Sequence, residues 1–204
     1  MNIWIPSQPL LLASASATRR AMLADAGLPV DVAVAAIDER AIDGPLRKNG
    51  AAPRDMALAL AQAKAMAVSA QHPDRIVLGA DQILDCDGAI FDKAPDHAAA
   101  QMHLARLAGR THRLTCAAVA VRNGAVVCDA VSEARLTMRP LDSAAIARYA
   151  DEAGAVLTRS VGAYEIEGLG AHLFARVEGD HFTVRGLPLL GLLAAFRAQG
   201  WIAL

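Results

Sequence analysis

The sequence predicts an α/β fold built on a mixed β-sheet with flanking helices. Short apolar segments of β character alternate along the chain with longer segments of helical periodicity, an order typical of α/β proteins. Some of the β segments are joined by Asp87-Gly88 and Asn123-Gly124, dipeptides that favour tight hairpins. Because hairpins join antiparallel strands, we expect parallel and antiparallel pairing in one sheet. A length of 204 residues suits one sizeable domain, so we expect a single domain over 1–204.

The first half of the chain carries clear start and stop signals for helices. Ser16 is placed to cap a helix that contains Met22 and Leu23 and stops at Gly27. Pro53 suits the first turn of a long helix. The polar stretch IDERAIDGPLRKNG contains glycine and proline, and we expect it to be a mobile loop. The strands expected in this half span 10–13, 30–35 and 76–80.

The second half is predicted in the same way. Asp96 follows Pro95 and should begin a helix that ends near Gly109, and Asp142 should begin another that runs to about Ala153. A loop is expected over 162–170. The remaining expected elements are strands at 89–91, 114–121 and 125–136 and a closing helix at 187–198.

The composition excludes several classes of protein. Hydrophobic residues make up 54% and aromatic residues 4%, so the core must consist of small and branched aliphatic side chains. Lys and Arg number 20 against 21 Asp and Glu, and this balance gives no general attraction to nucleic-acid polymers or anionic membranes. No segment reaches about 18 uninterrupted apolar residues, so no membrane-spanning helix is expected.

The amino terminus and the cysteines indicate a cytoplasmic protein. The first apolar run has no initial Lys or Arg and is interrupted by Pro6 and Pro9, which argues against a signal peptide. Cys86, Cys116 and Cys128 are odd in number and widely spaced, so neither a disulfide framework nor a zinc-binding pair is visible.

The stretch SASATRR is a candidate anion site. Hydroxyl groups of Ser14 and Ser16 and the free N–H groups of a helix start both favour negative charge, and Arg19 adds a planar fork suited to phosphate. The alternative is an ordinary capped helix with two solvated arginines, which the spacing alone favours.

Two further charged groups have both a functional and an ordinary interpretation. Asp38 and Glu39 could hold Mg²⁺ together with substrate phosphates, or they could belong to a solvated loop. Lys64 stands alone on the apolar helix segment AQAKAMA, where a lysine commonly extends to water.

Asp81 directly follows the apolar segment RIVLGA, and ligands usually bind at the carboxyl edge of such strands. Asp85 and Asp87 flank a tight turn and are expected to serve as turn residues. The spacing of these aspartates does not match a calcium-binding loop, because no glutamate stands at the twelfth position. The stretch YEIEGLG contains Gly168 and Gly170 but lacks the context of a dinucleotide fingerprint.

Taken in order, the motifs resemble those of the Maf family of nucleoside triphosphate pyrophosphatases over nearly the whole chain. The matching stretches are LASASATRR, IDER, LALAQAKA, VLGADQIL, DG-x-I-x-DK, LAGRTHRL, YEIEGLG and RVEGDHFTVRGLPL. The resemblance implies an elongated mixed α/β structure with two lobes around a central cleft, related to that of inosine triphosphatase and usually dimeric. It also implies a cytoplasmic, metal-dependent hydrolase that cleaves a nucleoside triphosphate between the α and β phosphates.

The resemblance assigns roles to several of the candidate residues. Asp81 matches the catalytic base and, with Glu39, would hold a divalent metal ion, Mg²⁺ or Mn²⁺. The positions that match the phosphate and metal site are Ser14, Arg19, Glu39, Lys64 and Lys93. Under this hypothesis Arg19, Lys64 and Lys93 stabilise phosphate charge, so Lys64 becomes a phosphate ligand.

Three positions separate substrate groups in the family, and here they are Thr18, Gln82 and Glu167. Gln82 and Glu167 match the group that resembles 7-methyl-GTP pyrophosphatases, whereas Thr18 does not. An ionised Glu167 only accepts hydrogen bonds, which suits the donor-rich edge of guanine or a cationic methylated purine. The alternatives are a pyrophosphatase for dTTP or UTP, a regulator of cell division that binds nucleotides without turnover, and a hydrolase of deaminated purine triphosphates, against which SASATRR and YEIEG argue.

Overall fold

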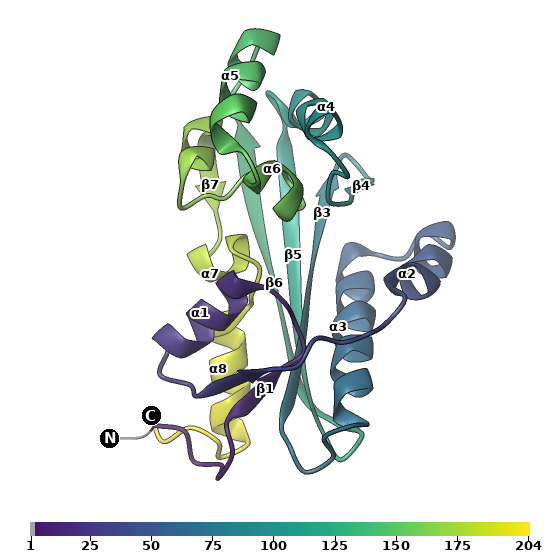
Figure 1. Ribbon diagram of the computed structural model, residues 1–204, viewed down its shortest axis with the longest axis vertical. Helices are drawn as coiled ribbons and strands as arrows, with labels where there is room; N and C mark the ends of the chain where they lie inside the picture. Colours follow the sequence, from purple (N-terminus) through teal and green to yellow (C-terminus); the bar gives the residue numbers. More distant parts are fainter. Residues whose placement is uncertain (1–2) are drawn as a thin grey trace. The chain divides into compact units, whose positions relative to one another are not determined.

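The computed structural model describes residues 3–204, which form an α/β structure on one mixed sheet (Figure 1). Among these residues the sheet has seven strands in the order β2-β1-β3-β5-β6-β7, with β4 paired to β3. The strands are β1 (Leu10–Leu12), β2 (Val30–Val32), β3 (Val77–Cys86), β4 (Ala89–Phe91), β5 (Thr111–Arg122), β6 (Ala125–Met138) and β7 (Phe174–Glu178). Strand β1 is parallel to β2 and β3, whereas β4 and β7 pair antiparallel, so the predicted mixed sheet is confirmed.

Helices precede and follow these strands along the chain. They are α1 (Ala17–Asp25), α2 (Glu39–Lys48), α3 (Pro53–Ser69), α4 (His97–Leu107), α5 (Ser143–Ala153), α6 (Val156–Arg159), α7 (His181–Val184) and α8 (Leu189–Ala198), with a 3₁₀ helix, η1, at Leu169–Leu173. Across the described part of the chain, no helix is long and apolar enough to cross a membrane.

The chain divides into two compact units, each built from discontinuous segments. The first unit takes the chain up to Gln82, then Cys116–Ser132 and Gly186–Leu204. The second unit takes Ile83–Thr115 and Glu133–Arg185. The long strands β3, β5 and β6 therefore contribute residues to both units. The single domain and the cleft expected from the sequence stay predictions.

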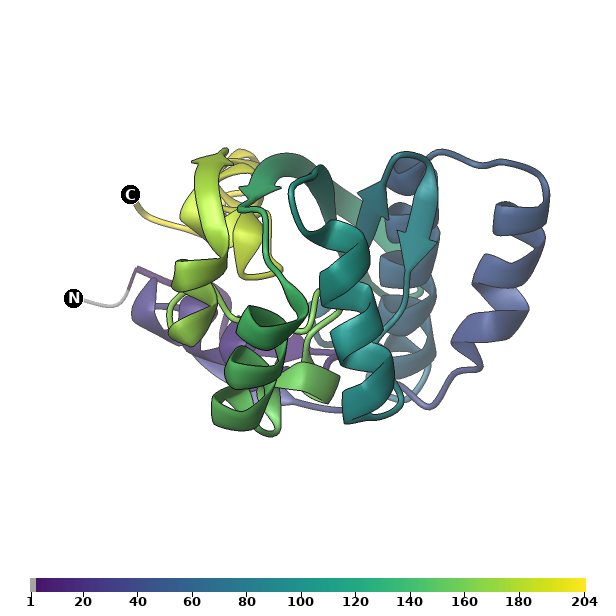
Figure 2. The same ribbon diagram turned by 90° about the horizontal axis from the view of Figure 1, so that it is seen from above.

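In the first unit, helices pack on the sheet through small residues. Gly191 of α8 meets Ala130 of β6, and Gly79 of β3 meets Ala61 of α3. Helix α2 lies alongside α3 (Figure 2). The buried residues of α3 recur at three- and four-residue spacing on one face, which is the pattern of an amphipathic helix. They are Met56, Ala57, Leu60, Ala61, Ala65, Val68 and Ser69.

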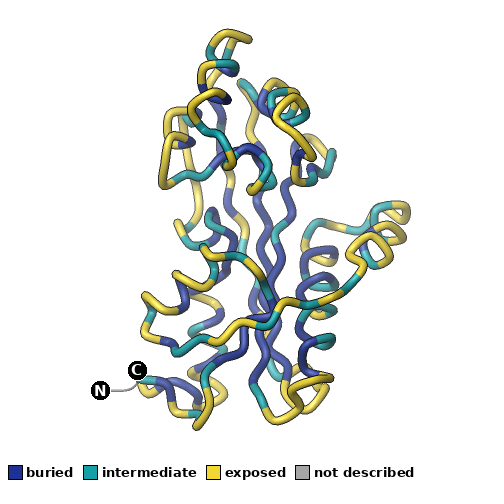
Figure 3. Tube along the Cα trace, viewed as in Figure 1, coloured by how far each residue is buried: buried dark blue, intermediate teal, exposed yellow. Residues whose placement is uncertain are grey.

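The second unit has its own apolar core, centred on helices α4 and α5 and the adjoining strand segments. An aromatic group of His112, Tyr164 and Phe174 lies in this region, with ring centroids 4.7 to 5.9 Å apart. Leu104, Leu107 and Leu136 have no exposed surface. In Figure 3 the strands β3 and β5 are buried along most of their length.

The local turn and cap signals are confirmed. Asp87 and Gly88 have φ values of 52° and 81°, and Asn123 and Gly124 have 53° and 69°, as two-residue hairpins require. Ser16 caps α1, and Asp96 and Asp142 cap α4 and α5 through their side chains. Pro53 occupies the first turn of α3.

The expectation of a mobile loop at 37–50 was wrong, because helix α2 fills most of it. Asp38 accepts hydrogen bonds from the N–H groups of Arg40 and Ala41, which satisfies the first turn. Within the helix, Asp43 and Arg47 form an ion pair of 2.6 Å at a spacing of four residues. These interactions outweigh the unfavourable helix propensity of Gly44 and Pro45.

Other boundaries also differ from expectation. Strand β2 ends at Val32 rather than at residue 35, and β3 continues through Asp81 to Cys86. Strand β7 and helices α6 and α7 were not predicted, because each is short and β7 is largely exposed and rich in charge.

Candidate active site

Three charged side chains of the first unit meet at Lys64. The Nζ atom of Lys64 lies 2.6 Å from Oδ1 of Asp81 and 2.9 Å from Oε1 of Glu39. The side chains of Lys64 and Asp81 are 12% and 11% exposed, whereas that of Glu39 is 54% exposed. Lys64 therefore does not extend freely to water, and one ammonium group holds two carboxylates of different exposure.

The close approach of α3 to β3 makes this arrangement possible. A Cβ atom on Gly79 would lie 2.0 Å from the carbonyl oxygen of Ala61 and 2.7 Å from the backbone nitrogen of Ala65. Only glycine fits there, since both neighbours are backbone atoms of the facing helix. Lys64 precedes Ala65 on that helix, and Asp81 follows Gly79 by two residues. The glycine thus brings the two charged residues within reach of each other.

Asp81 lies within a strand, not after its end as the sequence suggested. Strand β1 pairs with β3 only as far as Leu12, opposite Leu78, whereas β3 runs on for several residues. Asp81 therefore stands beyond the carboxyl end of the neighbouring parallel strand, where an α/β sheet offers its binding edge. Asp81 thus lies level with the carboxyl end of β1, although its own strand, β3, continues to Cys86.

Burial raises the pKa of Asp81 above the ordinary value of 3.8. The loss of hydration is the largest cause, because it penalises the charged carboxylate. The positive charges of Lys64 and Arg19 and the hydrogen bond from Lys64 act in the opposite direction, while Glu39 raises the pKa further. A carboxylate whose pKa is raised is a stronger base than an exposed one.

The turn between β1 and α1 places Ser14, Ser16 and Arg19 together. Ser16 caps the helix by accepting a hydrogen bond of 3.2 Å from the N–H group of Arg19. The guanidinium of Arg19 donates from Nη1 to Ser14 Oγ and to the carbonyl oxygen of Ala80, and from Nε to the carbonyl oxygen of Gly186. Arg19 therefore braces the segment that carries Asp81, and fewer of its donors remain for phosphate than expected.

Two of the predicted substrate-selecting residues belong to the first unit. Gln82 follows Asp81, and its amide nitrogen lies 3.3 Å from the sulfur of Cys116. Thr18 lies in the first turn of α1 and is half-buried. Gly186 is close to Gln82, since a Cβ atom added to this glycine would lie 3.6 Å from the amide oxygen.

Glu167, the third of these residues, lies in a turn of the second unit and is paired. Nε of Arg185 donates a hydrogen bond of 2.9 Å to Oε1 of Glu167. The two side chains are 22% and 35% exposed for Arg185 and Glu167 respectively. Glu167, expected from the sequence to be an ionised acceptor for the base, is thus one half of an ion pair.

One buried contact and several more exposed polar contacts hold the turn that carries Glu167. Nε2 of His112 and the hydroxyl of Tyr164 are 2.6 Å apart, and burial lowers the pKa of His112 to about 4. Ser160 bonds to both the N–H and the carbonyl of Tyr164, and Arg159 donates two hydrogen bonds to Glu165. The turn is therefore fixed by residues that the sequence did not single out.

Lys93 also belongs to the second unit, where it follows β4 and is exposed. The structure thus brings together Ser14, Ser16, Arg19, Glu39, Lys64 and Asp81 within the first unit, with Thr18 and Gln82 on the same segments. Lys93 and Glu167 belong to the other unit.

The donor set at Lys64 fits a hard divalent cation. Among residues 3–204, no group of three or more His, Cys, Asp or Glu is arranged to hold a metal ion. Glu39 and Asp81 nevertheless direct one carboxylate oxygen each toward the same cationic group. Mg²⁺ keeps several waters and commonly uses one or two protein carboxylates together with substrate phosphates, so two suffice.

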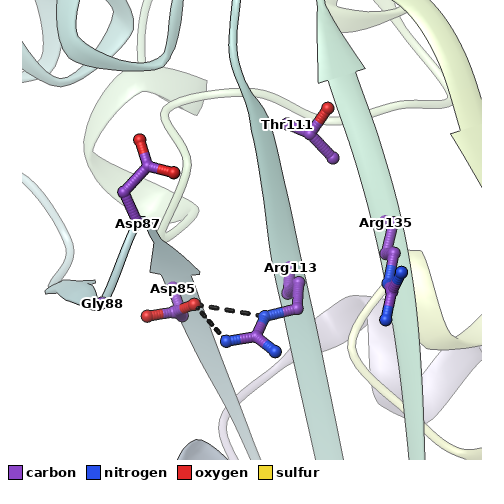
Figure 4. A pocket seen from close by; sticks show the side chains of 6 residues that line it. All are labelled: Asp85, Asp87, Gly88, Thr111, Arg113 and Arg135. Atoms are coloured by element: carbon purple, nitrogen blue, oxygen red, sulfur yellow. Dashed lines mark hydrogen bonds and ion pairs between the residues drawn. The ribbon is translucent and has the colours of Figure 1, made fainter.

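Asp85 is not the turn residue that the sequence suggested. It lies in β3, is 4% exposed, and accepts hydrogen bonds of 2.7 and 3.2 Å from Arg113 of β5 (Figure 4). Asp87 does lie in the turn and pairs with Arg110. A hollow of about 320 Å³ in the second unit is lined by Asp85, Asp87, Gly88, Thr111, Arg113 and Arg135. None of the predicted catalytic or substrate-selecting residues lines it.

Comparison with known proteins shows the family to which the chain belongs. Residues 9–199 match the family described as "Maf-like protein". A nucleoside triphosphate pyrophosphatase of Nitrobacter winogradskyi is 49% identical over 205 residues, covering 100% of both chains. One from Rhodopseudomonas palustris is 51% identical over 204 residues, again with 100% of both chains. A 7-methyl-GTP pyrophosphatase of Mesorhizobium japonicum is 48% identical over 196 residues, covering 96% of this chain and 98% of the other.

Proposed function

Because the chain belongs to the family of Maf-like proteins, we propose that it is a nucleoside triphosphate pyrophosphatase. The reaction is hydrolysis between the α and β phosphates, which releases a nucleoside monophosphate and pyrophosphate. The observation that carries this proposal is the meeting of Glu39, Lys64 and Asp81, since a hydrolase of a polyanion needs a base and positive charge at one place.

Asp81 serves as the general base. Its buried carboxylate has a raised pKa and accepts a proton from the attacking water. Lys64 holds one carboxylate oxygen at 2.6 Å and fixes its orientation. The other oxygen remains for the water.

The positive charge at the site stabilises phosphate. Lys64 contacts Asp81 and Arg19 contacts the carbonyl oxygen of the preceding Ala80, and the first turn of α1 adds N–H groups that lack partners within the helix. Ser14 and Ser16 contribute hydroxyl groups at the same turn. The family resemblance also assigns Lys93, an exposed residue of the second unit, to the phosphate-binding positions.

Glu39 and Asp81 would hold a divalent cation, Mg²⁺ or Mn²⁺. When bound, such an ion neutralises phosphate charge and positions the substrate oxygens. Its ligands are hard oxygen atoms, in keeping with the preference of both metals.

The substrate is a triphosphate of the 7-methyl-GTP type, selected by Gln82 and Glu167. The relative from Mesorhizobium japonicum named for that nucleotide is 48% identical to this chain over nearly its whole length. The alternative substrates are dTTP and UTP.

The alternative from another class is a regulator that binds nucleotides without turnover. The contacts of Lys64 with Asp81 and Glu39 argue for catalysis instead. We further propose a cytoplasmic homodimer, whose mass light scattering would measure.

Pyrophosphate release from a panel of ordinary and modified nucleoside triphosphates, with Mg²⁺ or Mn²⁺ and with chelator, tests the function. Asp81→Asn should reduce kcat by roughly 10²- to 10⁴-fold, the usual contribution of a general base. Asp129→Asn, at an exposed position of the same unit, is the matched control. Absence of turnover of every triphosphate by the wild-type protein would contradict the proposal.

A further inference from the structure

Lys64 has two roles in the proposed function that it cannot fill from one position. It is a ligand of phosphate, yet its Nζ atom lies 2.6 Å from Oδ1 of Asp81 and 2.9 Å from Oε1 of Glu39. Asp81 and Glu39 are also the carboxylates assigned to the divalent cation. The ammonium group therefore contacts one oxygen of each carboxylate that the cation needs.

The ammonium group of Lys64 and a divalent cation compete for these oxygens. A metal ion bound to the same two oxygens would lie close to Nζ, and like charges repel strongly where little water surrounds them. The side chains of Lys64 and Asp81 are only 12% and 11% exposed, so the repulsion is weakly screened. The two cations therefore tend to exclude each other.

The charge balance of the group favours an exchange of one cation for the other. One ammonium faces two carboxylates, so one negative charge stays uncompensated within this group. A divalent cation balances both carboxylates and leaves the ammonium without a partner among them. A triphosphate supplies the missing partner, because its oxygens attract a lysine as a point charge.

The residues that must move for this exchange are the ones least fixed by their surroundings. Lys64 carries its charge on a flexible four-carbon stem, and Glu39 begins α2 with a side chain that is 54% exposed. Asp81 lies within β3, two residues after Gly79, whose contact with α3 leaves no spare room. Rotation of two side chains about a fixed aspartate is sufficient.

We propose that Lys64 and the divalent cation occupy the carboxylates of Glu39 and Asp81 in turn, so that binding of the cation displaces the ammonium group towards the phosphates. The inference rests on the proposed function, and it gives Lys64 two successive positions. The cation takes over the hold on Asp81, and the phosphates take up the released charge. By linkage, the cation and the triphosphate each raise the affinity for the other through Lys64.

Titration with Mn²⁺ alone measures the competition. K64M removes the ammonium group, and we expect it to bind Mn²⁺ about tenfold to a hundredfold more tightly than the wild-type protein in calorimetry. K64R keeps the charge and should bind no more tightly than the wild-type protein. K48M removes the same charge from an exposed position of the same unit and should show the wild-type affinity. An affinity of K64M equal to or below that of the wild-type protein would overturn the proposal.

A second substitution locates the bound ion. In K64M/D81N the gain in Mn²⁺ affinity should disappear, because Asp81 supplies one of the two charged ligands. A gain that persists in K64M/D81N would place the ion elsewhere and contradict the exchange.

Chemical labelling follows Lys64 in the unaltered protein. Brief acetylation of amines and mass spectrometry compare Lys64 with the exposed Lys48, which serves as an internal reference. Saturating Mg²⁺ should increase the labelling of Lys64 relative to Lys48, because the ammonium group loses both carboxylate partners. Unchanged or reduced labelling of Lys64 would refute the displacement, and this result does not depend on the folding of any variant.

Failure of the proposed function has a different signature from failure of this inference. If no triphosphate is hydrolysed but K64M binds Mn²⁺ more tightly, the function is wrong and the exchange is supported. If triphosphates are hydrolysed but K64M shows no gain in Mn²⁺ affinity, the function is supported and the exchange is wrong.

Discussion

The charged group around Lys64 and the Glu167–Arg185 pair contain the same kinds of side chain but differ in burial. The first is built on a helix and a strand, and two of its three members are nearly buried. The second is carried by a turn and a helix end, and both members are partly exposed. Burial perturbs the pKa of Asp81, which suits proton transfer, whereas partial exposure suits recognition of a group that must enter and leave.

The largest effect is expected from breaking the buried group. K64M removes the cation that holds Glu39 and Asp81, and we expect kcat/KM to fall by roughly 10²- to 10³-fold, the usual loss on removing one stabilising donor. Steady-state pyrophosphate release measures the effect. K48M, at an exposed lysine of the same unit, should retain nearly full activity. Comparable activity of K64M and K48M would contradict the role of Lys64.

Substitution of Gly79 disrupts the packing of α3 on β3, which brings Lys64 close to Asp81. G79A places a Cβ atom 2.0 Å from the carbonyl oxygen of Ala61, so α3 must move away from β3. We expect a loss of about 3 kcal/mol in the free energy of unfolding, measured by urea denaturation. G44A is the control, because a Cβ atom there meets nothing within 4 Å and should stabilise α2 slightly. Equal stabilities of the two variants would refute the packing argument.

The second unit should show a pH dependence that comes from His112. Its folded pKa of about 4 lies below the unfolded value of 6.5, so the unfolded state binds more protons between these values. The stabilisation is present above pH 6.5 and is lost as the pH falls towards 4, amounting to about 2 kcal/mol between pH 7 and pH 5. H112Q should flatten this dependence in urea titrations at the two pH values.

The control for that titration is H72Q, at an exposed histidine. The difference in the free energy of unfolding between pH 7 and pH 5 should be the same in H72Q as in the wild-type protein. If this difference is also unchanged in H112Q, the pH dependence comes from groups other than His112.

The smallest effect is expected at an exposed ion pair of the turn before Glu167. R159A removes both hydrogen bonds to Glu165, but the arginine side chain is 63% exposed. We expect a change of less than about 1 kcal/mol in the free energy of unfolding, because water screens such pairs. A larger loss would show that this pair, rather than the buried contact of Tyr164 with His112, holds the turn.

Features governed by neighbouring residues could be predicted from the sequence. The hairpin turns at Asp87-Gly88 and Asn123-Gly124 and the capped start of α5 at Asp142 follow from local chemistry that distant contacts did not alter. Helix α2 was missed because Gly44 and Pro45 indicate a loop, whereas the cap at Asp38 and the pair of Asp43 with Arg47 act against them.

The candidate site could be predicted only as a set of residues. Lys64 on its own helix was more typical of a solvated lysine, and its contact with Asp81 depends on the approach of α3 to Gly79. The pairing of Glu167 with Arg185 spans 18 positions and has no periodic pattern. Asp85 was expected in the turn because it stands close to Asp87-Gly88 in the sequence. Nothing in the sequence indicates that β3 extends to Cys86 or that Arg113 faces Asp85.

The hydrogen bond between Arg19 and Gly186 joins residues 167 positions apart. On the ribosome, the turn that carries Ser14 and Ser16 is synthesised early, yet the brace on Arg19 requires a segment that is synthesised much later. Contacts of such long range form slowly, since the closure of a large loop must precede them. The nascent chain therefore lacks this brace on Arg19 for most of its synthesis, and the candidate site is completed only when Gly186–Leu204 docks within the first unit.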